Sequence, residues 1–215
     1  MKIFIPIKEN SQRVPRKNFR MFQGKPLWKH TVDKVSDQYT VYIDTDSKEI
    51  MNECETLDNV IAYPRHKDLL GDKISVVSLI KNFRELYQVT DYICQIHVTS
   101  PFLQVEHLKI AQDKLVAGHD SVFSVDIMQQ RLWRKESYGY CPINHNPMKL
   151  EQTQDLPKYY CENSYLYAFK PEVLDQDNRI GKNPYLLELG FPYNLDIDTE
   201  QDWKIVSNAQ LLETH

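Results

Sequence analysis

The chain has 215 residues, a net charge of −4 and only six glycines, none of them in a Gly-x-Gly pair. Average usage would supply about fifteen glycines, and a glycine-rich dinucleotide fingerprint and a Walker A loop are both absent. No apolar run approaches the ~18 residues of a membrane span, no signal-peptide pattern opens the chain, and the four cysteines form no C-x-x-C pair. We therefore expect one cytoplasmic domain over residues 1–215, with no membrane partner and no zinc ribbon.

Short apolar runs alternate with segments of helical spacing through the first 125 residues. Strands are expected at residues 2–7, 40–44, 59–63, 92–98 and 121–125, and helices from residue 26, from residue 48, over 74–86 and over 105–115. This alternation predicts the α/β class, with a doubly wound, mostly parallel sheet and helices on both faces. Ligands bind such sheets at the carboxyl ends of the strands. Those ends are Lys8 onward, Asp44–Asp46, Arg65 and His97–Pro101.

The loop after the first strand is strongly basic. Residues 8–25 contain six lysines or arginines and one glutamate, whereas the whole chain is acidic. Binding to duplex nucleic acid needs a broad basic face, so we expect no nucleic-acid partner. A local basic loop favours a small polyanion such as a nucleoside triphosphate. The alternative is a solvated surface loop.

Residues 128–160 interrupt the alternation. They are rich in tyrosine and proline and show no helical period, which predicts an irregular or hairpin insertion that serves as an oligomerisation arm. Beyond it we expect a strand at 165–169, a short helix opening at Pro171, a last strand ending at 195–198, and a final helix that starts at Thr199.

Four motifs then stand in order along the chain. They are Pro-Ile-Lys-Glu-Asn-Ser-Gln-Arg-Val-Pro-Arg-Lys-Asn at 6–18, Thr-Ser-Pro at 99–101, Gln-Asp-Leu-Pro at 154–157 with Glu-Asn-Ser-Tyr-Leu-Tyr at 162–167, and Asp-Ile-Asp-Thr-Glu-Gln-Asp at 196–202. Together they resemble the acylneuraminate cytidylyltransferase family, which makes CMP-activated sialic and related nonulosonic acids. The resemblance covers nearly the whole chain. It implies a nucleotide-diphospho-sugar transferase-like (Rossmann-like) fold, CTP and an acidic 2-keto sugar as substrates, Mg²⁺ as cofactor, pyrophosphate as product, and a homodimer whose arm at 128–160 serves dimerisation or acceptor binding.

The resemblance also assigns residues. It places Lys8, Ser11, Arg13, Lys17, Asn18, Arg65, Thr99 and Ser100 at the nucleotide, with Asp72 ordering the loop beside Arg65. It places His97, Arg134, Asn163 and Tyr167 at the acceptor sugar, and it makes Asp198, Lys17 and Arg13 catalytic. The alternatives are a surface ion pair for Arg65 and an ordinary strand-end histidine for His97.

The chain departs from the family at three arginines. The family usually opens its loop with Ala-Arg-Gly-Gly-Ser-Lys, whereas this chain has Ile-Lys-Glu-Asn-Ser-Gln at 7–12. Lys8 keeps the charge and loses the bidentate fork of arginine. Family arginines that follow Thr-Ser-Pro and precede Gln-Asp-Leu-Pro are Leu103 and Thr153 in this chain. Arginine is the bidentate partner of carboxylates. The part of the site that binds the acceptor sugar therefore departs furthest from the family pattern, and we expect Arg134 to take the place of the missing arginines.

Two Asp-x-Asp pairs are candidate metal sites. Asp196 and Asp198 alternate on the expected last strand and so share one side, and two carboxylates there suit Mg²⁺. Asp198 is the preferred ligand and base. The alternative is that Asp198 and Thr199 cap the final helix. Asp44 and Asp46 stand directly before a helix, which favours a capping or structural role over a metal site.

Other functions remain open at this point. Within the same fold these are a cytidylyltransferase for a 3-deoxy-manno-octulosonate-like sugar or a phosphonate, a glycosyltransferase that uses Asp44 and Asp46, and a nucleotide-binding relative without catalysis. Release of pyrophosphate from CTP would separate the transferases of CMP from the last two.

Overall fold

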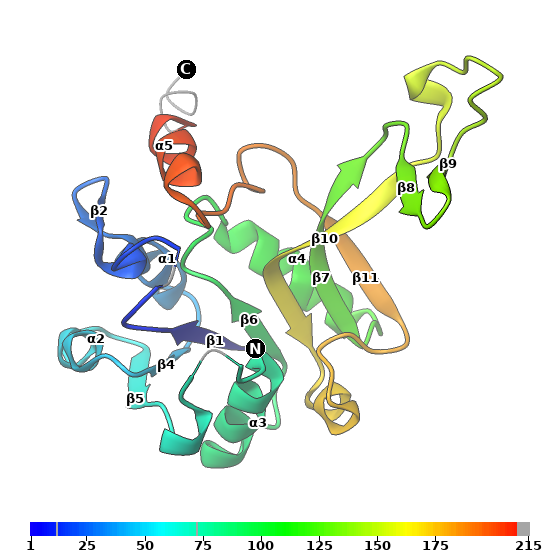
Figure 1. The fold of residues 1–215 in the computed structure, drawn as a ribbon. Helices are drawn as coiled ribbons and strands as arrows, with labels where there is room; N and C mark the ends of the chain where they lie inside the picture. Colours follow the sequence, from blue (N-terminus) through cyan, green and yellow to red (C-terminus); the bar gives the residue numbers. More distant parts are fainter. Residues whose placement is uncertain (12, 72, 210–215) are drawn as a thin grey trace.

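A computed structural model describes residues 1–11, 13–71 and 73–209, so Gln12 and the predicted loop-ordering Asp72 lie outside the described residues. Its centre is a seven-stranded sheet in the order β11-β7-β10-β6-β1-β4-β5 (Figure 1). The strands are β1 (Lys2–Ile7), β4 (Val41–Thr45), β5 (Val60–Pro64), β6 (Ile93–Ile96), β7 (Ser121–Met128), β10 (Tyr159–Phe169) and β11 (Pro184–Glu188). Only β10 runs antiparallel to its neighbours, β6 and β7. The predicted mostly parallel sheet is confirmed.

Helices cover both faces of this sheet. They are α1 (Leu27–Ser36), α2 (Lys48–Cys54), α3 (Val76–Leu86), α4 (Val105–Val116) and α5 (Glu200–Ala209). Successive residues of a strand point to opposite faces. Accordingly, Ile3 and Ile5 of β1 pack in the cluster that contains Trp28 of α1, and Phe4 packs in the cluster that contains Phe83 of α3. The doubly wound arrangement is therefore confirmed.

The sheet opens beside β1, where the chain changes direction. It runs from β1 outward through β4 to β5 and then returns to β6 on the other side of β1. Pairing with β6 stops at Phe4, whereas pairing with β4 continues through Pro6 to Ile7. Pro6 thus lies beyond the last β6 partner, where its missing N–H costs no ladder bond on that side. The carboxyl ends of β1 and β6 flank a topological switch point, the expected place for a ligand.

Shorter elements complete the molecule. The 3₁₀ helix η1 (Lys17–Phe19) and the strand β2 (Met21–Phe22) lie within the basic loop, β3 (Lys25–Pro26) lies at its end, and η2 (Lys67–Leu69) follows β5. The expected insertion is a two-stranded hairpin, β8 (Trp133–Glu136) and β9 (Gly139–Pro142), followed by η3 (Thr153–Asp155). This hairpin extends away from the central sheet (Figure 1). The short helix at Pro171 is η4 (Pro171–Gln176), a 3₁₀ helix. No helix of the described residues is long and apolar enough to cross a membrane.

Two expectations for the C-terminal part are wrong. Residues 195–198 form no strand, and β11 at Pro184–Glu188 is the edge strand instead. Ile197 is buried against Phe22, Leu27 and α5, so the alternation of apolar and acidic residues reflects an extended segment with one buried side chain. The strand at 165–169 is also longer than expected, because β10 begins at Tyr159.

Candidate active site

The basic loop after β1 sends its cations in two directions. Arg13 Nη2 lies 2.8 Å from Asp198 Oδ1, and Lys17 Nζ lies 3.6 Å from the same oxygen. Arg16 instead pairs with Glu49 of α2 at 3.0 Å, and Arg20 with Glu200 of α5 at 2.6 Å. Arg13 and Lys17 therefore converge on the predicted catalytic carboxylate, whereas the other two arginines tie the loop to helices.

The backbone of this loop is fastened from two sides. Asn18 Nδ2 donates to the carbonyl of Lys8 at 2.9 Å, and the amide of Glu9 donates to Asp46 Oδ1 at 2.7 Å. Lys8 Nζ donates to the carbonyl of Gly71 at 3.2 Å. Ser47, and not Asp46, caps α2 by accepting from the amide of Ile50. Asp46 thus holds the basic loop in place, which is a structural role as expected, although it does not cap the helix.

The segment that carries Asp196 and Asp198 lies across the end of β6. The amide of Ile197 donates to the carbonyl of Thr99 at 3.0 Å, and Ser100 Oγ donates to Asp196 Oδ1 at 3.2 Å. Lys17 also donates to the carbonyl of Ile197. Ser100 is fully buried, so the predicted contact of its hydroxyl with the nucleotide is corrected. The Thr-Ser-Pro motif positions the acidic segment.

The final helix has its own cap. Asp202 accepts hydrogen bonds from the amide and hydroxyl of Thr199, and Thr199 Oγ1 accepts from the amide of Asp202. Burial alone would raise the pKa of Asp202, but these hydrogen bonds from Thr199 hold it below its usual value. This reciprocal pairing is a capping box. Asp198 therefore does not cap α5, and its carboxylate interacts with Arg13 and Lys17 instead.

Both acids face one cavity of about 420 Å³. It is lined by Asp126, Asn163, Tyr165, Asn194, Leu195, Asp196, Asp198 and Asp202. Asn163 Nδ2 donates to Asp126 Oδ1 at 3.2 Å, and its buried Oδ1 has no hydrogen-bond partner among the described residues. A buried amide oxygen without a donor is unfavourable, so this wall of the cavity is suited to a ligand that carries hydroxyl or amide groups.

Known proteins are similar to this chain in sequence. Residues 3–210 match the sequence pattern of the family described as Cytidylyltransferase. The chain belongs to the cytidylyltransferase family. It is 30% identical over 209 residues to N-acylneuraminate cytidylyltransferase A of Danio rerio, covering 94% of this chain and 48% of that protein. It is 26% identical over 212 residues to pseudaminic acid cytidylyltransferase of Campylobacter jejuni, covering 92% and 90%. The chain thus spans about half the length of the fish relative.

Solved structures support the cytidylyltransferase fold. A CMP:2-keto-3-deoxy-manno-octonic acid synthetase complexed with CTP superposes with a TM-score of 0.67 at 12% identity, over 99% of this chain and 98% of the other. A 4-diphosphocytidyl-2C-methyl-D-erythritol synthase from Anaerococcus prevotii gives a TM-score of 0.66 at 13% identity, over 98% and 96%. At these identities the likeness concerns the fold alone.

Arg65, like Ser100, is predicted at the nucleotide of this cytidylyltransferase family member and is buried. The guanidinium of Arg65 is 2% exposed and pairs through Nε with the fully buried Asp44, while its Nη2 donates to the carbonyl of Asp44 at 3.2 Å. Burial raises the pKa of Asp44, and Arg65 opposes that shift. The predicted nucleotide contact of Arg65 is therefore corrected to an internal ion pair. Asp44 and Asp46, one buried and one bound to Glu9, do not face a common metal position.

The predicted acceptor residues are only partly brought together. Asn163 lines the cavity, and His97 lies at the end of β6, where burial lowers its pKa to about 4, opposed by Asp196 and reinforced by Arg179 and Lys17. Tyr167 is fully buried and donates to Glu162, so it supports the wall and does not face the cavity. Arg134 is on β8 of the hairpin, where it pairs with Glu136, and it does not line the cavity.

Several cavity residues escaped sequence reasoning. Tyr165 lines the cavity and donates to the carbonyl of Asn194, and Asn194 Nδ2 donates to Asp126 Oδ1 at 3.0 Å. The available signal was the position of Asp126 at the carboxyl end of an expected strand. Ser11, predicted at the nucleotide, is partly buried in the loop after β1.

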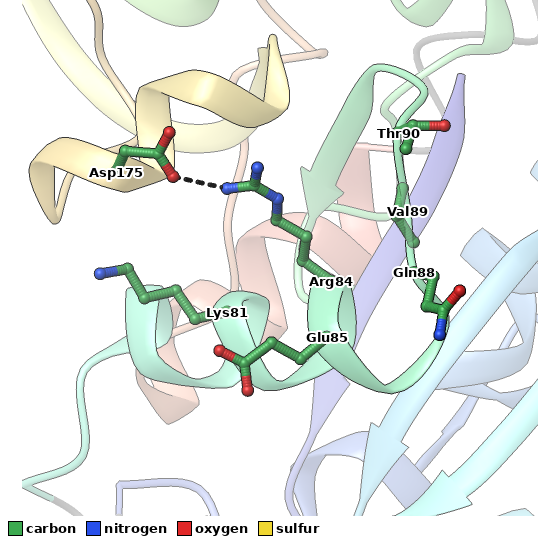
Figure 2. A pocket seen from close by; sticks show the side chains of 7 residues that line it. All are labelled: Lys81, Arg84, Glu85, Gln88, Val89, Thr90 and Asp175. Carbon is green, nitrogen blue, oxygen red and sulfur yellow. Dashed lines mark hydrogen bonds and ion pairs between the residues drawn. The ribbon is translucent and has the colours of Figure 1, made fainter.

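A second cavity, of about 470 Å³, lies at the C-terminal end of α3 (Figure 2). Lys81, Arg84 and Glu85 line it, and Arg84 pairs with Asp175 at 2.7 Å. Lys81 pairs with Asp177. None of the predicted site residues lines this cavity. It lies at the amino end of β6, the opposite end from the switch point.

The cavity beside α5 fits a metal held jointly with substrate. Among the described residues no group of three or more histidine, cysteine or acidic side chains is arranged to hold a metal ion. Asp196 and Asp198 provide two carboxylates on one cavity. Mg²⁺ commonly uses one or two carboxylates and completes its shell with substrate phosphates and water, so this donor set suits that ion when the nucleotide is present.

Proposed function

We propose that this chain transfers CMP from CTP to a 2-keto acid sugar of the nonulosonic type and releases pyrophosphate. The observation that carries the proposal is the convergence of Arg13 and Lys17, from the loop after β1, on Asp198 beside the cavity that Asp196 also lines. Cations for a triphosphate and carboxylates for a metal meet there, at the switch point of the sheet. The sugar acids named for the Danio rerio and Campylobacter jejuni relatives support the acceptor class.

The reaction needs little covalent chemistry from the protein. A hydroxyl oxygen of the sugar attacks the α-phosphorus, the bond from that phosphorus to the bridging oxygen breaks, and pyrophosphate carries away the electron pair. Catalysis by alignment and charge neutralisation suits this step. Arg13 and Lys17 neutralise the phosphates, Asn18 and Asp46 keep the loop in position, and Asn163 orients the sugar. Asp198 accepts the proton of the attacking hydroxyl.

Asp196 and Asp198 would hold Mg²⁺, which supplies positive charge at the α-phosphate and lowers the pKa of the attacking hydroxyl. Arg13 and Lys17 both lie close to Asp198 Oδ1. The triphosphate competes for these cations because it carries more negative charge than one carboxylate. Nucleotide binding therefore frees Asp198 for its role in the reaction.

The purified chain is expected to release pyrophosphate from CTP only when a suitable acceptor is present. The assay offers CTP and Mg²⁺ with N-acetylneuraminate, pseudaminate, 3-deoxy-manno-octulosonate or a phosphonate in turn. We expect turnover with a nonulosonate and loss of turnover in EDTA, restored by added Mg²⁺.

The other outcomes of this screen reject the proposal in defined ways. Turnover with only the octulosonate or only the phosphonate would assign the enzyme to a different acceptor class. Consumption of a preformed nucleotide sugar without pyrophosphate release indicates a glycosyltransferase. Thermal stabilisation by CTP without any turnover indicates a binding protein.

We propose further that the hairpin arm pairs two copies of the chain. Its large apolar side chains are exposed to a degree unusual for a monomer surface. They are Trp133, Tyr138, Tyr140, Ile143, Met148 and Leu150, of which Met148 is 91% and Leu150 93% exposed. A second copy of the same arm would cover this surface, because most oligomers are symmetric pairs with self-complementary interfaces.

Replacing Leu150 and Met148 together with aspartate is expected to turn a dimer into a monomer. Two buried charges cost far more than the apolar contacts they replace. Sedimentation equilibrium measures the mass. Val116→Asp, at a 68% exposed position on α4, is the matched control and should leave the mass unchanged. A wild-type chain that sediments as a monomer contradicts the proposal.

A further inference from the structure

A chain of polar side chains crosses the sheet behind the acceptor side of the site. Arg179 follows η4, and its Nη1 donates to Gln95 Oε1. Gln95 is fully buried on β6, and its Nε2 lies 2.6 Å from His97 Nε2. Gln95 and His97 are two residues apart on one strand, so their side chains share a face. Arg179, Gln95 and His97 thus form a continuous relay that ends at the carboxyl end of β6.

The position of Arg179 is fixed by its surroundings. Its guanidinium carbon lies 3.6 Å from the centroid of the Tyr167 ring. Tyr167 is the cross-strand partner of Gln95, so the ring and the amide present one surface to the arginine. Asn178 Oδ1 accepts from the backbone amide of Arg179 at 2.8 Å.

The turn that follows Arg179 is also anchored. The amides of Lys182 and Asn183 donate to Asp120 Oδ2 at 2.7 and 2.8 Å, and the amide of Gly181 donates to Ser121 Oγ at 2.9 Å. A Cβ atom at Gly181 would lie 2.3 Å from the carboxyl carbon of Asp120. Only glycine allows this close approach. The segment that bears Arg179 is therefore held rigidly against the start of β7.

This relay dictates where the proton of His97 resides. Arginine is always a donor, so it fixes the amide of Gln95 with oxygen toward Arg179 and nitrogen toward His97. The amide nitrogen is a donor, and the ring nitrogen that faces it must accept. In a neutral imidazole the other nitrogen then carries the hydrogen. This result holds whichever way the ring is turned, because it depends only on which nitrogen faces Gln95.

The protonated nitrogen has no hydrogen-bond partner among the described residues. We propose that Arg179 is a positioning residue that, through Gln95, locks His97 in one neutral tautomer, so that the free N–H of His97 donates to a carboxylate oxygen of the acceptor sugar. This inference rests on the proposed function. A donor is useful toward the carboxylate because that group of the sugar carries no proton. The charge of Arg179 interacts with the carboxylate of Glu162, which accepts from Tyr167, so the effect of Arg179 on the sugar runs through Gln95 and His97.

The relay also accounts for the altered acceptor half of the sequence. Leu103 and Thr153 stand where arginines were expected, and Arg134 is on the arm. Within one chain, Arg179 is the arginine whose guanidinium is connected by hydrogen bonds to a predicted acceptor residue, His97. Its effect on the sugar is indirect, through the orientation of two side chains.

The test combines a spectroscopic and a kinetic measurement on the full chain. Protein labelled with ¹⁵N at histidine reports by NMR which ring nitrogen of His97 carries hydrogen, and His97→Asn identifies the signals by their loss. We expect a single tautomer in the wild type at pH 7.5 and a mixture in Arg179→Met. Gln95→Glu should reverse the assignment, because a carboxylate cannot donate and the ring nitrogen facing it must carry the hydrogen.

Kinetics with CTP and N-acetylneuraminate or pseudaminate supply the second measurement. In Arg179→Met the KM of the acceptor is expected to rise about tenfold, the value of one hydrogen bond to a charged group, while the KM of CTP stays within about twofold. Arg84→Gln removes an arginine of α3 that pairs with Asp175 of η4, the helix that precedes Arg179. It is the matched control and should change neither KM nor the tautomer.

The outcomes are distinct. Protonation of the nitrogen that faces Gln95 in the wild type overturns the relay, and so does an Arg179→Met variant with an unchanged tautomer and acceptor KM. Equal increases in both KM values indicate general structural damage and also overturn it. A wild type with the expected tautomer and no pyrophosphate release with any acceptor supports the relay and rejects the proposed function.

Discussion

Replacing Asp198 with alanine is expected to lower turnover by about a thousandfold, the scale on which removal of one preorganised electrostatic group affects catalysis. In the proposed reaction the variant lacks a metal ligand and the proton acceptor, and it also releases Arg13 and Lys17 from their carboxylate partner. These cations then bind the triphosphate without competition. We therefore expect kcat to fall while the KM of CTP stays the same or decreases, measured by pyrophosphate release.

Folding should be little affected by this change. Asp198 is 44% exposed and the helix cap is formed by Thr199 and Asp202, so the loss of free energy of unfolding should be below about 1 kcal/mol. Glu49→Gln is the matched control, because it removes an exposed carboxylate that pairs with Arg16 of the same loop. Turnover within a few fold of the wild type in Asp198→Ala would contradict the assigned role.

Replacing Arg65 with methionine is expected to lower the free energy of unfolding by about 3–5 kcal/mol at pH 7.5. The change leaves the carboxylate of Asp44 fully buried without its cation. The loss should depend on pH. The folded chain already holds the proton of Asp44 to a higher pH than the unfolded chain does, and removal of Arg65 strengthens this effect. The unfolded state is the same in both chains, so the penalty is smallest below the folded pKa of Asp44 in the wild type, where both folded chains hold the proton, and it grows as pH rises from that pKa toward the higher folded pKa of the variant.

Urea unfolding at several pH values between 5 and 8 measures this dependence. The difference between wild type and Arg65→Met should shrink toward the acidic end of the range. Arg16→Met, which removes a surface pair with Glu49, should cost under about 1 kcal/mol at every pH. A stable Arg65→Met protein whose only defect is a raised KM for CTP would restore the direct nucleotide contact that the sequence suggested.

The sheet could be predicted from sequence because its strands are buried on both sides. Residues 3–7 are continuously apolar, residues 92–98 are apolar except for Gln95 and His97, and the helices between these runs have clear periodicity. The edge strand β11 escaped because Pro184 begins it and its side chains are only partly buried, with the exception of Leu187. The false strand at 195–198 has the opposite cause, since alternation records which side chains are buried and says nothing about whether a neighbouring strand pairs with them.

The site residues also fall into those that a sequence motif reveals and those that only the fold reveals. Arg13, Lys17 and Asp198 could be named because they stand in contiguous motifs, and the structure brings them together. Arg65 could not be placed correctly, because a sequence does not reveal that its cation faces inward toward Asp44. Arg179 stands in no motif, and its contact with Gln95 joins residues 84 positions apart. Only the fold shows that contact.

The antiparallel strand β10 determines the order in which the sheet can fold while the chain is being synthesised. It lies between β6 and β7 and is the piece that joins the two halves of the sheet. Residues up to 128 can emerge from a ribosome and pair β1 with β4, β5 and β6, but β7 has no place beside them until residues 159–169 follow. Asn163 arrives with that strand, and Asp196 and Asp198 arrive later still. The pocket is thus closed by the last fifth of the chain, after most of its scaffold has been made.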